Sequence, residues 1–180
     1  MTKKKEILDI ALIHFAQNGY ENTSLDNIAK DANITKPAIY YHFKSKKEIY
    51  NQIFINHYKN LKFKNNLKDY IYKMGEFFIQ NPQIAKLFAK ELSSNMEHLE
   101  HETIEIVSKT LKTLCYILKD TNINPFFIQT LIVSSFTTYS HTLKMRETIS
   151  GIVQSPKLLI DFNIIDEIYN TIDLYIKGRE

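Results

Sequence analysis

Residues 35–46 gather side chains whose chemistry suits binding to a nucleic acid. Lysine can donate to guanine O6 or N7 and neutralise phosphate, tyrosine hydroxyls can bond phosphates or bases, and proline or alanine can touch a thymine methyl group. Between Lys30 and Lys47 there are five lysines and one acidic residue, a local charge of +4. The whole chain of 180 residues carries a net charge of only +3, so its basic character is concentrated in this segment.

A short helix is predicted directly before this segment. Ser24 suits the N-cap position, where its hydroxyl accepts from the amide of Asn27 or a neighbour, and Thr23 is a second candidate. The apolar residues that follow share one helical face: Leu25, Ile28, Ala29 and Ala32. Asn33 stands where the chain must turn sharply, and asparagine tolerates a left-handed backbone better than most residues. The pattern therefore predicts a helix that ends in a tight turn.

A second helix is predicted to follow Thr35. This residue is a suitable N-cap, and Pro37 fits the first turn because the amide there has no intrahelical partner. Ile39 and Phe43 lie four residues apart and would face inward. The outer faces then carry Lys36, Pro37, Ala38, Tyr40, Tyr41 and His42. Two outward tyrosines are unusual on a solvated surface and fit better against a groove of DNA; the alternative is a helix end packed on a core.

The stretch TSLDNIAKDANITKPAIYYHFKSKKEI resembles the DNA-binding signature of the tetracycline repressor (TetR) family, and KPAIYYHFKSK is its most specific part. The resemblance covers residues 3–50, and the family usually has glycine where this chain has Asn33. It implies an all-α fold with two parts. Residues 1–47 would form a three-helix helix-turn-helix domain, and residues 48–180 a larger helical domain for effector binding and dimerisation.

The resemblance also implies roles for single residues. Those expected closest to base edges are Lys36, Pro37, Ala38 and Tyr40. Those expected to hold phosphates are Thr23, Ser24, Tyr41, His42 and Lys46. Thr35 and Lys44 complete the predicted DNA-binding set. The implied function is a transcriptional regulator, expected to be a repressor, that binds a near-palindromic operator in double-stranded DNA as a homodimer.

The expected switch is a small apolar or amphipathic effector that releases the DNA. The predicted effector contacts are Phe78, Phe88, Tyr116, Phe127, Phe136, Tyr139 and His141, although aromatic residues at helical spacing more often belong to a core. Apolar stripes on the last two predicted helices indicate the dimer interface: Ile128, Leu131, Ile132, Ser135, Ile165, Ile168, Ile172 and Tyr175. The alternative is a DNA-binding protein of the same fold, or an activator, that is controlled by a protein partner without a small ligand.

Helices are predicted throughout the rest of the chain, because four glycines and four prolines leave few breaks and no stretch alternates like a strand. The capping box of Ser45 and Glu48 predicts a helix from Lys46 to about Lys62. Further helices are expected at Asn66–Gln80, Pro82–Ser93, Glu97–Lys119, Asn124–Glu147 and Asp161–Lys177.

Other kinds of function find little support in the sequence. No motif of an enzyme or of cofactor binding occurs, so neither an enzyme nor a cofactor is expected, and a helical protein that does not bind DNA is the weakest alternative. His98 and His101 lie three apart beside carboxylates but match no zinc motif, so no metal is predicted. Cys115 is the only cysteine and is expected to be buried. The charged N-terminus and the polar residues of the later apolar segment predict a cytoplasmic protein without a membrane partner.

Overall fold

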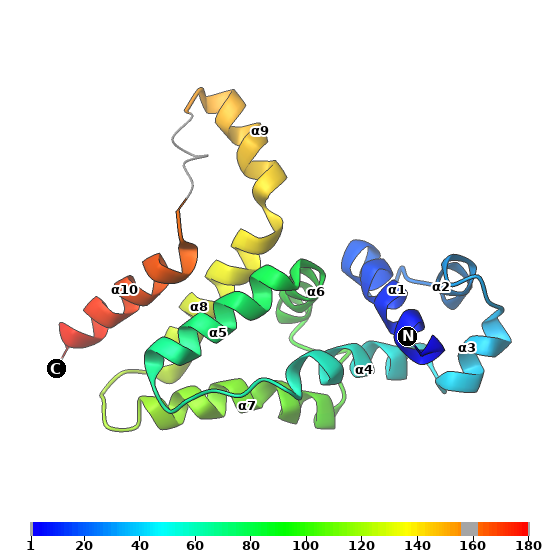
Figure 1. The fold of residues 1–180 in the computed structure, drawn as a ribbon, viewed down its shortest axis with the longest axis horizontal. Helices are drawn as coiled ribbons and strands as arrows, with labels where there is room; N and C mark the ends of the chain where they lie inside the picture. The colour runs from blue at the N-terminus through cyan, green and yellow to red at the C-terminus, as the bar shows by residue number, and fades with distance from the viewer. Residues whose placement is uncertain (1, 156–161, 180) are drawn as a thin grey trace. The chain divides into compact units, whose positions relative to one another are not determined.

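The computed structural model describes residues 2–155 and 162–179, which contain helices and no strand. Figure 1 shows the helices in chain order. They are α1 (Lys3–Asn18), α2 (Leu25–Asp31), α3 (Lys36–His42), α4 (Lys46–Tyr58), α5 (Leu67–Gln80), α6 (Pro82–Ser93), α7 (His101–Ile117), α8 (Pro125–His141), α9 (Leu143–Val153) and α10 (Ile164–Lys177). The predicted all-α fold is confirmed. The start predicted for the last helix, Asp161, lies outside the described residues.

The predicted helix over residues 124–147 is wrong, because the chain forms two helices there. Thr142 separates α8 from α9 with backbone angles of φ −107° and ψ 10°, outside the helical region. Its hydroxyl donates to the carbonyl of Thr138 at 2.7 Å, and the hydroxyl of Thr137 donates to the carbonyl of Val133 at 2.7 Å. Such bonds back to the preceding turn bend helices, so the Thr- and Ser-rich end of α8 accounts for the break.

The helices α4 and α7 are also shorter than predicted. α4 ends at Tyr58, and α7 begins at His101. Asn95 and Met96 have φ values of +54° and +59°, so the chain turns through a left-handed conformation before α7 can start. The expected helix start at Glu97 is therefore corrected.

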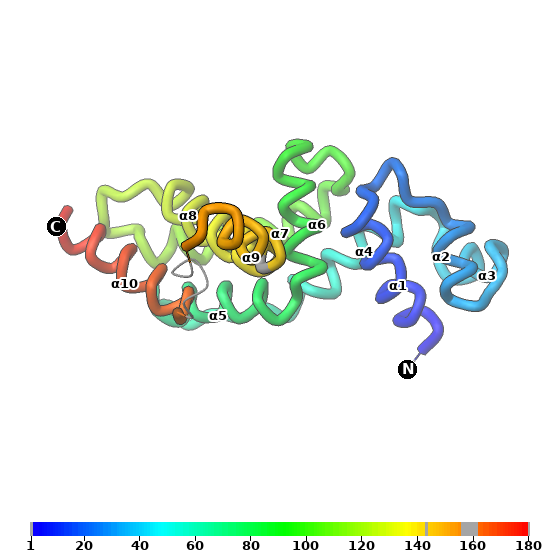
Figure 2. Tube along the Cα trace, turned by 90° about the horizontal axis from the view of Figure 1, so that it is seen from above, coloured from blue at the N-terminus to red at the C-terminus, as the bar shows by residue number. Residues whose placement is uncertain are grey.

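The described chain divides into two compact units. The first unit comprises Met1–Leu61 and Leu87–Lys109, which include α1 to α4 and parts of α6 and α7. α1 packs against α2 and α4, and α2 packs against α3. Figure 2 shows the trace of these four helices from above. Their packing buries one apolar core that includes Ile7, Ala11, Phe15, Ile28, Ile39, Phe43, Ile49 and Phe54. The predicted division at residues 47 and 48 does not coincide with this boundary and stays a prediction.

The second unit comprises Lys62–Lys86 and Thr110–Glu180. α5 packs against both α8 and α10, and the three helices lie side by side in Figure 1. Gly75 makes this close approach possible, since a Cβ atom there would stand 2.7 Å from Cγ1 of Ile165 and 3.0 Å from Cζ of Phe136. The Tyr70 hydroxyl donates to Gln129 at 2.5 Å across the α5–α8 contact. Apolar packing, with a few polar bonds, thus holds this unit together.

Candidate nucleic-acid interface

The two helices of the predicted helix-turn-helix begin and end as the sequence indicates. The Ser24 hydroxyl accepts from the amide of Asn27 at 3.2 Å, and the Thr35 hydroxyl accepts from the amide of Ala38 at 3.4 Å. Asn33 has a φ of +51° between the helices. Two side-chain caps and one left-handed residue therefore set the turn that presents α3.

α3 divides into a buried side and an exposed side. Ile39 and Phe43 are 0% and 1% exposed, so they anchor the helix in the core of the first unit. Tyr40 is 50% exposed and Tyr41 is 86% exposed. This exposure contradicts the alternative in which the aromatic helix end is packed on a core. The outer face of α3 is therefore open to a partner.

Lys36 stands at the start of this exposed face. Its Nζ atom lies 2.9 Å from Oδ2 of Asp26 on α2, and both side chains are largely exposed. The hydrogen bond with Asp26 raises the pKa of the Lys36 ammonium group above its ordinary value. An exposed ion pair of this kind is weak, so the ammonium group of Lys36 can leave Asp26 and bind a base edge or a phosphate instead. Asp26 was not among the predicted site residues, although it lies on the helix that precedes the turn.

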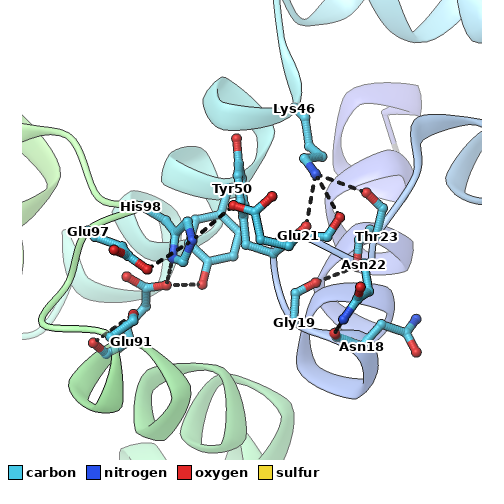
Figure 3. A network of polar contacts seen from close by, with 12 residues as sticks. Asn18, Gly19, Glu21, Asn22, Thr23, Lys46, Tyr50, Glu91, Glu97 and His98 are labelled. Atoms are coloured by element: carbon cyan, nitrogen blue, oxygen red, sulfur yellow. Dashed lines mark hydrogen bonds and ion pairs between the residues drawn. The ribbon is translucent and has the colours of Figure 1, made fainter.

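Lys46 holds the start of α4 against the turn between α1 and α2, as Figure 3 shows. Its ammonium group donates to the carbonyls of Tyr20 at 2.9 Å, Thr23 at 3.2 Å and Glu21 at 3.4 Å. It also lies 4.3 Å from the centroid of the Tyr20 ring. The phosphate contact expected of Lys46 stays a prediction, and it would require the ammonium group to give up some of these carbonyls.

Thr23 is turned into the protein. The residue is 3% exposed, and its hydroxyl donates to the carbonyl of Gly19 at 2.7 Å and to that of His14 at 3.2 Å. The hydroxyl therefore stabilises the turn, and the phosphate contact expected of Thr23 stays a prediction. The only sign of this role in the sequence is that Thr23 follows Gly19 by four residues.

α4 follows α3 closely along the chain, since α3 ends at His42 and α4 begins at Lys46. The Ser45 hydroxyl accepts from the amide of Glu48 at 3.0 Å, which confirms the predicted cap. The Glu48 carboxylate reaches back to the amide of Lys44 at 2.6 Å rather than to Ser45. The side chain of Lys44 remains exposed and that of His42 is half-buried. Together with Lys36, these groups give the outer side of α3 a basic border suited to phosphates.

Comparison with known proteins agrees with this geometry. Residues 7–53 match the family described as bacterial regulatory proteins, tetR family. This N-terminal segment is therefore similar to the DNA-binding part of TetR-family regulators. Over 49 residues the chain is 53% identical to the negative transcriptional regulator IcaR of the biofilm operon icaADBC in Staphylococcus aureus. The aligned region covers 27% of this chain and 26% of that protein.

Two further comparisons extend beyond the helix-turn-helix. The chain is 28% identical over 116 residues to the probable acrEF/envCD operon repressor of Escherichia coli, which covers 64% of this chain and 41% of that protein. It therefore matches less than half the length of either of these two relatives. The crystal structure of the transcriptional regulator FadR from Bacillus subtilis in complex with stearoyl-CoA superimposes with a TM-score of 0.63 at 20% identity, covering 98% of this chain and 99% of that one. This likeness shows the fold.

The predicted effector residues do not gather around one described cavity. Phe78 and Phe136 are completely buried in the second unit, whereas Tyr116 and Phe127 are 53% and 43% exposed. Tyr139 is half-buried beneath the guanidinium of Arg146, whose Cζ lies 4.3 Å from the ring centroid. The exposed residue His141 has a pKa lowered by desolvation. Effector contacts at these positions stay predictions.

Phe88, another predicted effector contact, belongs to the first unit and is 5% exposed. Its ring centroid lies 5.7 Å from that of Tyr58 and 6.4 Å from that of Phe54, both on α4. The residue is therefore part of the core of the first unit, and its contact with an effector stays a prediction.

The predicted dimer residues fall into two groups. Ile128, Ile132 and Ile172 are at most 1% exposed, so they form the core of a single protomer and are corrected as interface residues. The others retain accessible surface: Leu131, Ser135, Ile165, Ile168 and Tyr175. Leu174 adds a side chain that is 71% exposed on α10. Most of the apolar stripe predicted on α8 is thus its buried side, and Leu131 lies on its accessible side.

Two histidines and the cysteine are the remaining residues that the sequence singled out, namely His98, His101 and Cys115. Within residues 2–155 and 162–179, no group of three His, Cys, Asp or Glu side chains could hold a metal ion. The side chain of His101 is 87% exposed, while that of His98 is only 15% exposed. Cys115 is exposed, which corrects the expectation that it is buried. None of the described helices has the length and apolar character needed to cross a bilayer.

Proposed function

We propose that this chain is a transcriptional regulator of the TetR type that represses its target by binding a near-palindromic duplex as a homodimer. The observation that carries the proposal is the exposed face of α3, where Tyr40 and Tyr41 are accessible beside Lys36 and Lys44. Tyrosine hydroxyls and lysine ammonium groups supply both base and phosphate contacts. A two-fold dimer would place two such helices in successive major grooves, roughly 34 Å apart or a multiple of that distance.

The experiment that tests this proposal is selection of bound fragments from a random duplex pool at near-physiological salt, followed by sequencing. Enrichment of a near-palindrome is the expected result. Recovery of unrelated sequences by the folded protein would contradict sequence-specific reading. Recovery of a single half-site without its mirror image would contradict the dimer.

Leu131 and Leu174 support a dimer formed through α8 and α10. Both side chains are exposed, at 36% and 71%, and an apolar surface of this kind is usually covered in an assembly. Sedimentation velocity on the whole chain measures the association directly. A species of twice the mass is expected, and a monomer at every accessible concentration would contradict this part of the proposal.

For the effector we propose a small amphipathic molecule that binds the second unit. The neighbouring FadR structure holds stearoyl-CoA, so this fold accommodates a long apolar chain with a charged head in that protein. Stearoyl-CoA is therefore the first probe to test against this chain. It should raise the melting temperature and release the selected duplex, whereas unchanged melting and DNA binding would exclude this effector.

A second candidate is a regulator of the same fold that responds to a protein partner and needs no small ligand. The complete burial of Phe78 and Phe136 favours it, because two of the expected effector contacts are already filled by protein. The close approach at Gly75 leaves equally little space between α5, α8 and α10. Failure of a broad panel of apolar molecules to shift the melting temperature would favour this candidate.

A further inference from the structure

Glu91 is a buried carboxylate outside the helix-turn-helix. It lies on α6 and is 1% exposed. Its Oε1 atom accepts from the hydroxyl of Tyr50 on α4 at 2.5 Å and lies 2.8 Å from Nδ1 of His98. Its Oε2 atom has no hydrogen-bond partner among the described residues. A carboxylate buried in this way is costly unless its partners hold it firmly, so Tyr50 and His98 are the groups that make the arrangement stable.

Tyr50 is suited to donate in this pair. Burial and the hydrogen bond to Glu91 both raise the pKa of its phenol well above the ordinary value. The hydroxyl therefore keeps its proton over the whole physiological range. Its ring also contacts Phe15 and Tyr20, with centroid distances of 4.8 and 4.9 Å.

His98 extends the network from Glu91 to the turn between α1 and α2. Its ring centroid is 4.6 Å from that of Tyr20, and its Nε2 atom is 3.5 Å from Oε1 of Glu21 and 3.7 Å from Oε1 of Glu97. Three carboxylates and two tyrosine rings thus face this imidazole, and Figure 3 shows it beside Glu91 and Glu97. The side chain is 15% exposed, so it is held rather than free in solvent.

Asn51 fixes the backbone that carries His98. This residue of α4 is 2% exposed, and its side-chain amide donates to the carbonyl of His98 at 3.2 Å. Its side-chain oxygen accepts from the amide of Glu100 at 2.7 Å. Side-chain bonds to two backbone groups fix the α6–α7 connection on α4 and leave the imidazole little freedom.

His98 and Lys46 both contact the turn between α1 and α2. Tyr20 and Glu21 supply two of the three carbonyls bound by the Lys46 ammonium group, and Tyr20 offers its ring as well. The turn leads directly into the Ser24 cap of α2, and α2 packs against α3. The position of this turn therefore sets where α2 and α3 stand against α4.

We propose that Glu91 and His98 are positioning residues for DNA binding. Through Tyr20 and Glu21 they hold the α1–α2 turn, so the segment Leu87–Lys109 completes the DNA-reading part of the chain. The inference rests on the proposed DNA-binding function and adds residues far from the helix-turn-helix to it. The first residues of α6, before Leu87, and the last residues of α7, after Lys109, belong to the second unit. The helices that carry the network therefore run into that unit along the chain.

The test compares two histidine variants of the full chain on the duplex recovered by selection. His98→Asn keeps a donor near Nδ1 but removes the ring that contacts Tyr20 and Glu21. His101→Asn is the matched control, because that side chain is 87% exposed in the same stretch. His98→Asn should weaken binding by about tenfold, the scale of ordinary coupling between sites. His101→Asn should stay within about twofold of the wild type, as expected for an exposed side chain.

A comparison of stability with affinity separates positioning from mere stability. The free energy of unfolding of His98→Asn is measured under the same conditions as its dissociation constant for the selected duplex. The loss of affinity should persist in protein that circular dichroism shows to be fully folded. A fully folded His98→Asn variant with wild-type affinity would overturn the proposal.

Tyr50→Phe provides a second variant in case His98→Asn does not fold. It removes one hydroxyl and keeps the ring that packs on Phe15 and Tyr20. Circular dichroism should show a folded protein, while the affinity for the duplex should fall by about tenfold. A folded Tyr50→Phe variant with wild-type affinity would overturn the positioning role. If the wild type shows no salt-dependent binding to any duplex, the proposed function fails. This outcome differs from failure of the positioning role, in which the wild type binds and the variants bind equally well.

Discussion

Both units of this chain have an apolar core, but the first unit adds polar contacts that fix two short helices. There, side-chain caps, the left-handed Asn33 and the Lys46 contacts fix α2 and α3, which have seven residues each. In the second unit, longer helices pack around Gly75, Phe78 and Phe136. Short helices gain little from burial, so their ends must be specified by polar groups. The helix-turn-helix therefore depends on polar groups at its helix ends, whereas the second unit depends on apolar contacts between distant segments.

The largest expected effect lies in the packing of the second unit. Ile128→Ala removes a completely buried side chain of α8 and should lower the free energy of unfolding by about 2–5 kcal/mol. Leu131→Ala, three residues later on the same helix, removes a side chain that is 36% exposed and should cost about 0.5 kcal/mol or less. Urea denaturation compares the two variants.

The same pair also tests the assignment of the dimer surface. Leu131→Ala should weaken the association seen by sedimentation velocity, because its side chain lies on the accessible side of α8. Equal losses of protomer stability in both variants would contradict the division of α8 into a core side and an interface side.

The next effect concerns the polar contacts of the first unit. Lys46→Ala removes hydrogen bonds to three backbone carbonyls and should lower the free energy of unfolding by about 1–3 kcal/mol. Lys44→Ala is the control, since its exposed ammonium group should matter only for DNA and reduce the slope of log affinity against log salt by about one. A Lys46→Ala variant as stable as the wild type would show that the carbonyl contacts do not hold the turn.

A smaller effect is expected at the turn between α2 and α3. Asn33 has a φ of +51°, and valine there should cost about 1–2 kcal/mol because a β-branched side chain is strained in this conformation. Asn33→Gly should remain within about 1 kcal/mol of the wild type, since glycine adopts this conformation without strain. Thermal unfolding followed by circular dichroism measures both. Valine tolerated as well as glycine would contradict the account of the turn.

The sequence predicts local features of the reading surface well, because each depends on residues a few positions apart. The caps at Ser24 and Thr35, the left-handed Asn33 and the exposure of Tyr40 all follow from short-range rules. The contacts of Lys46 could not be predicted, because its carbonyl partners lie 23 to 26 residues earlier in the chain. A lysine in a basic segment gives no sign of whether it faces phosphate or protein.

The second unit was less predictable for a related reason. An apolar stripe shows which side of α8 is hydrophobic, but it does not tell whether that side meets the same protomer or a partner. Ile128 and Ile132 proved to be core, and Leu131 proved to be accessible. The break at Thr142 depends on hydroxyls that bond to the backbone of the helix, which helix periodicity does not record.

The most direct test of the central claim, that the outer face of α3 reads DNA, is a comparison of two duplexes of equal length. One carries the selected sequence and the other a scrambled sequence, and their dissociation constants are measured at the same salt concentration. The wild type should prefer the selected duplex by at least about 1,000-fold. Lys36→Ala should lose about 1–3 kcal/mol of that preference at one position of each half-site. Equal affinity of the wild type for both duplexes, or an undiminished preference in Lys36→Ala, would contradict the claim.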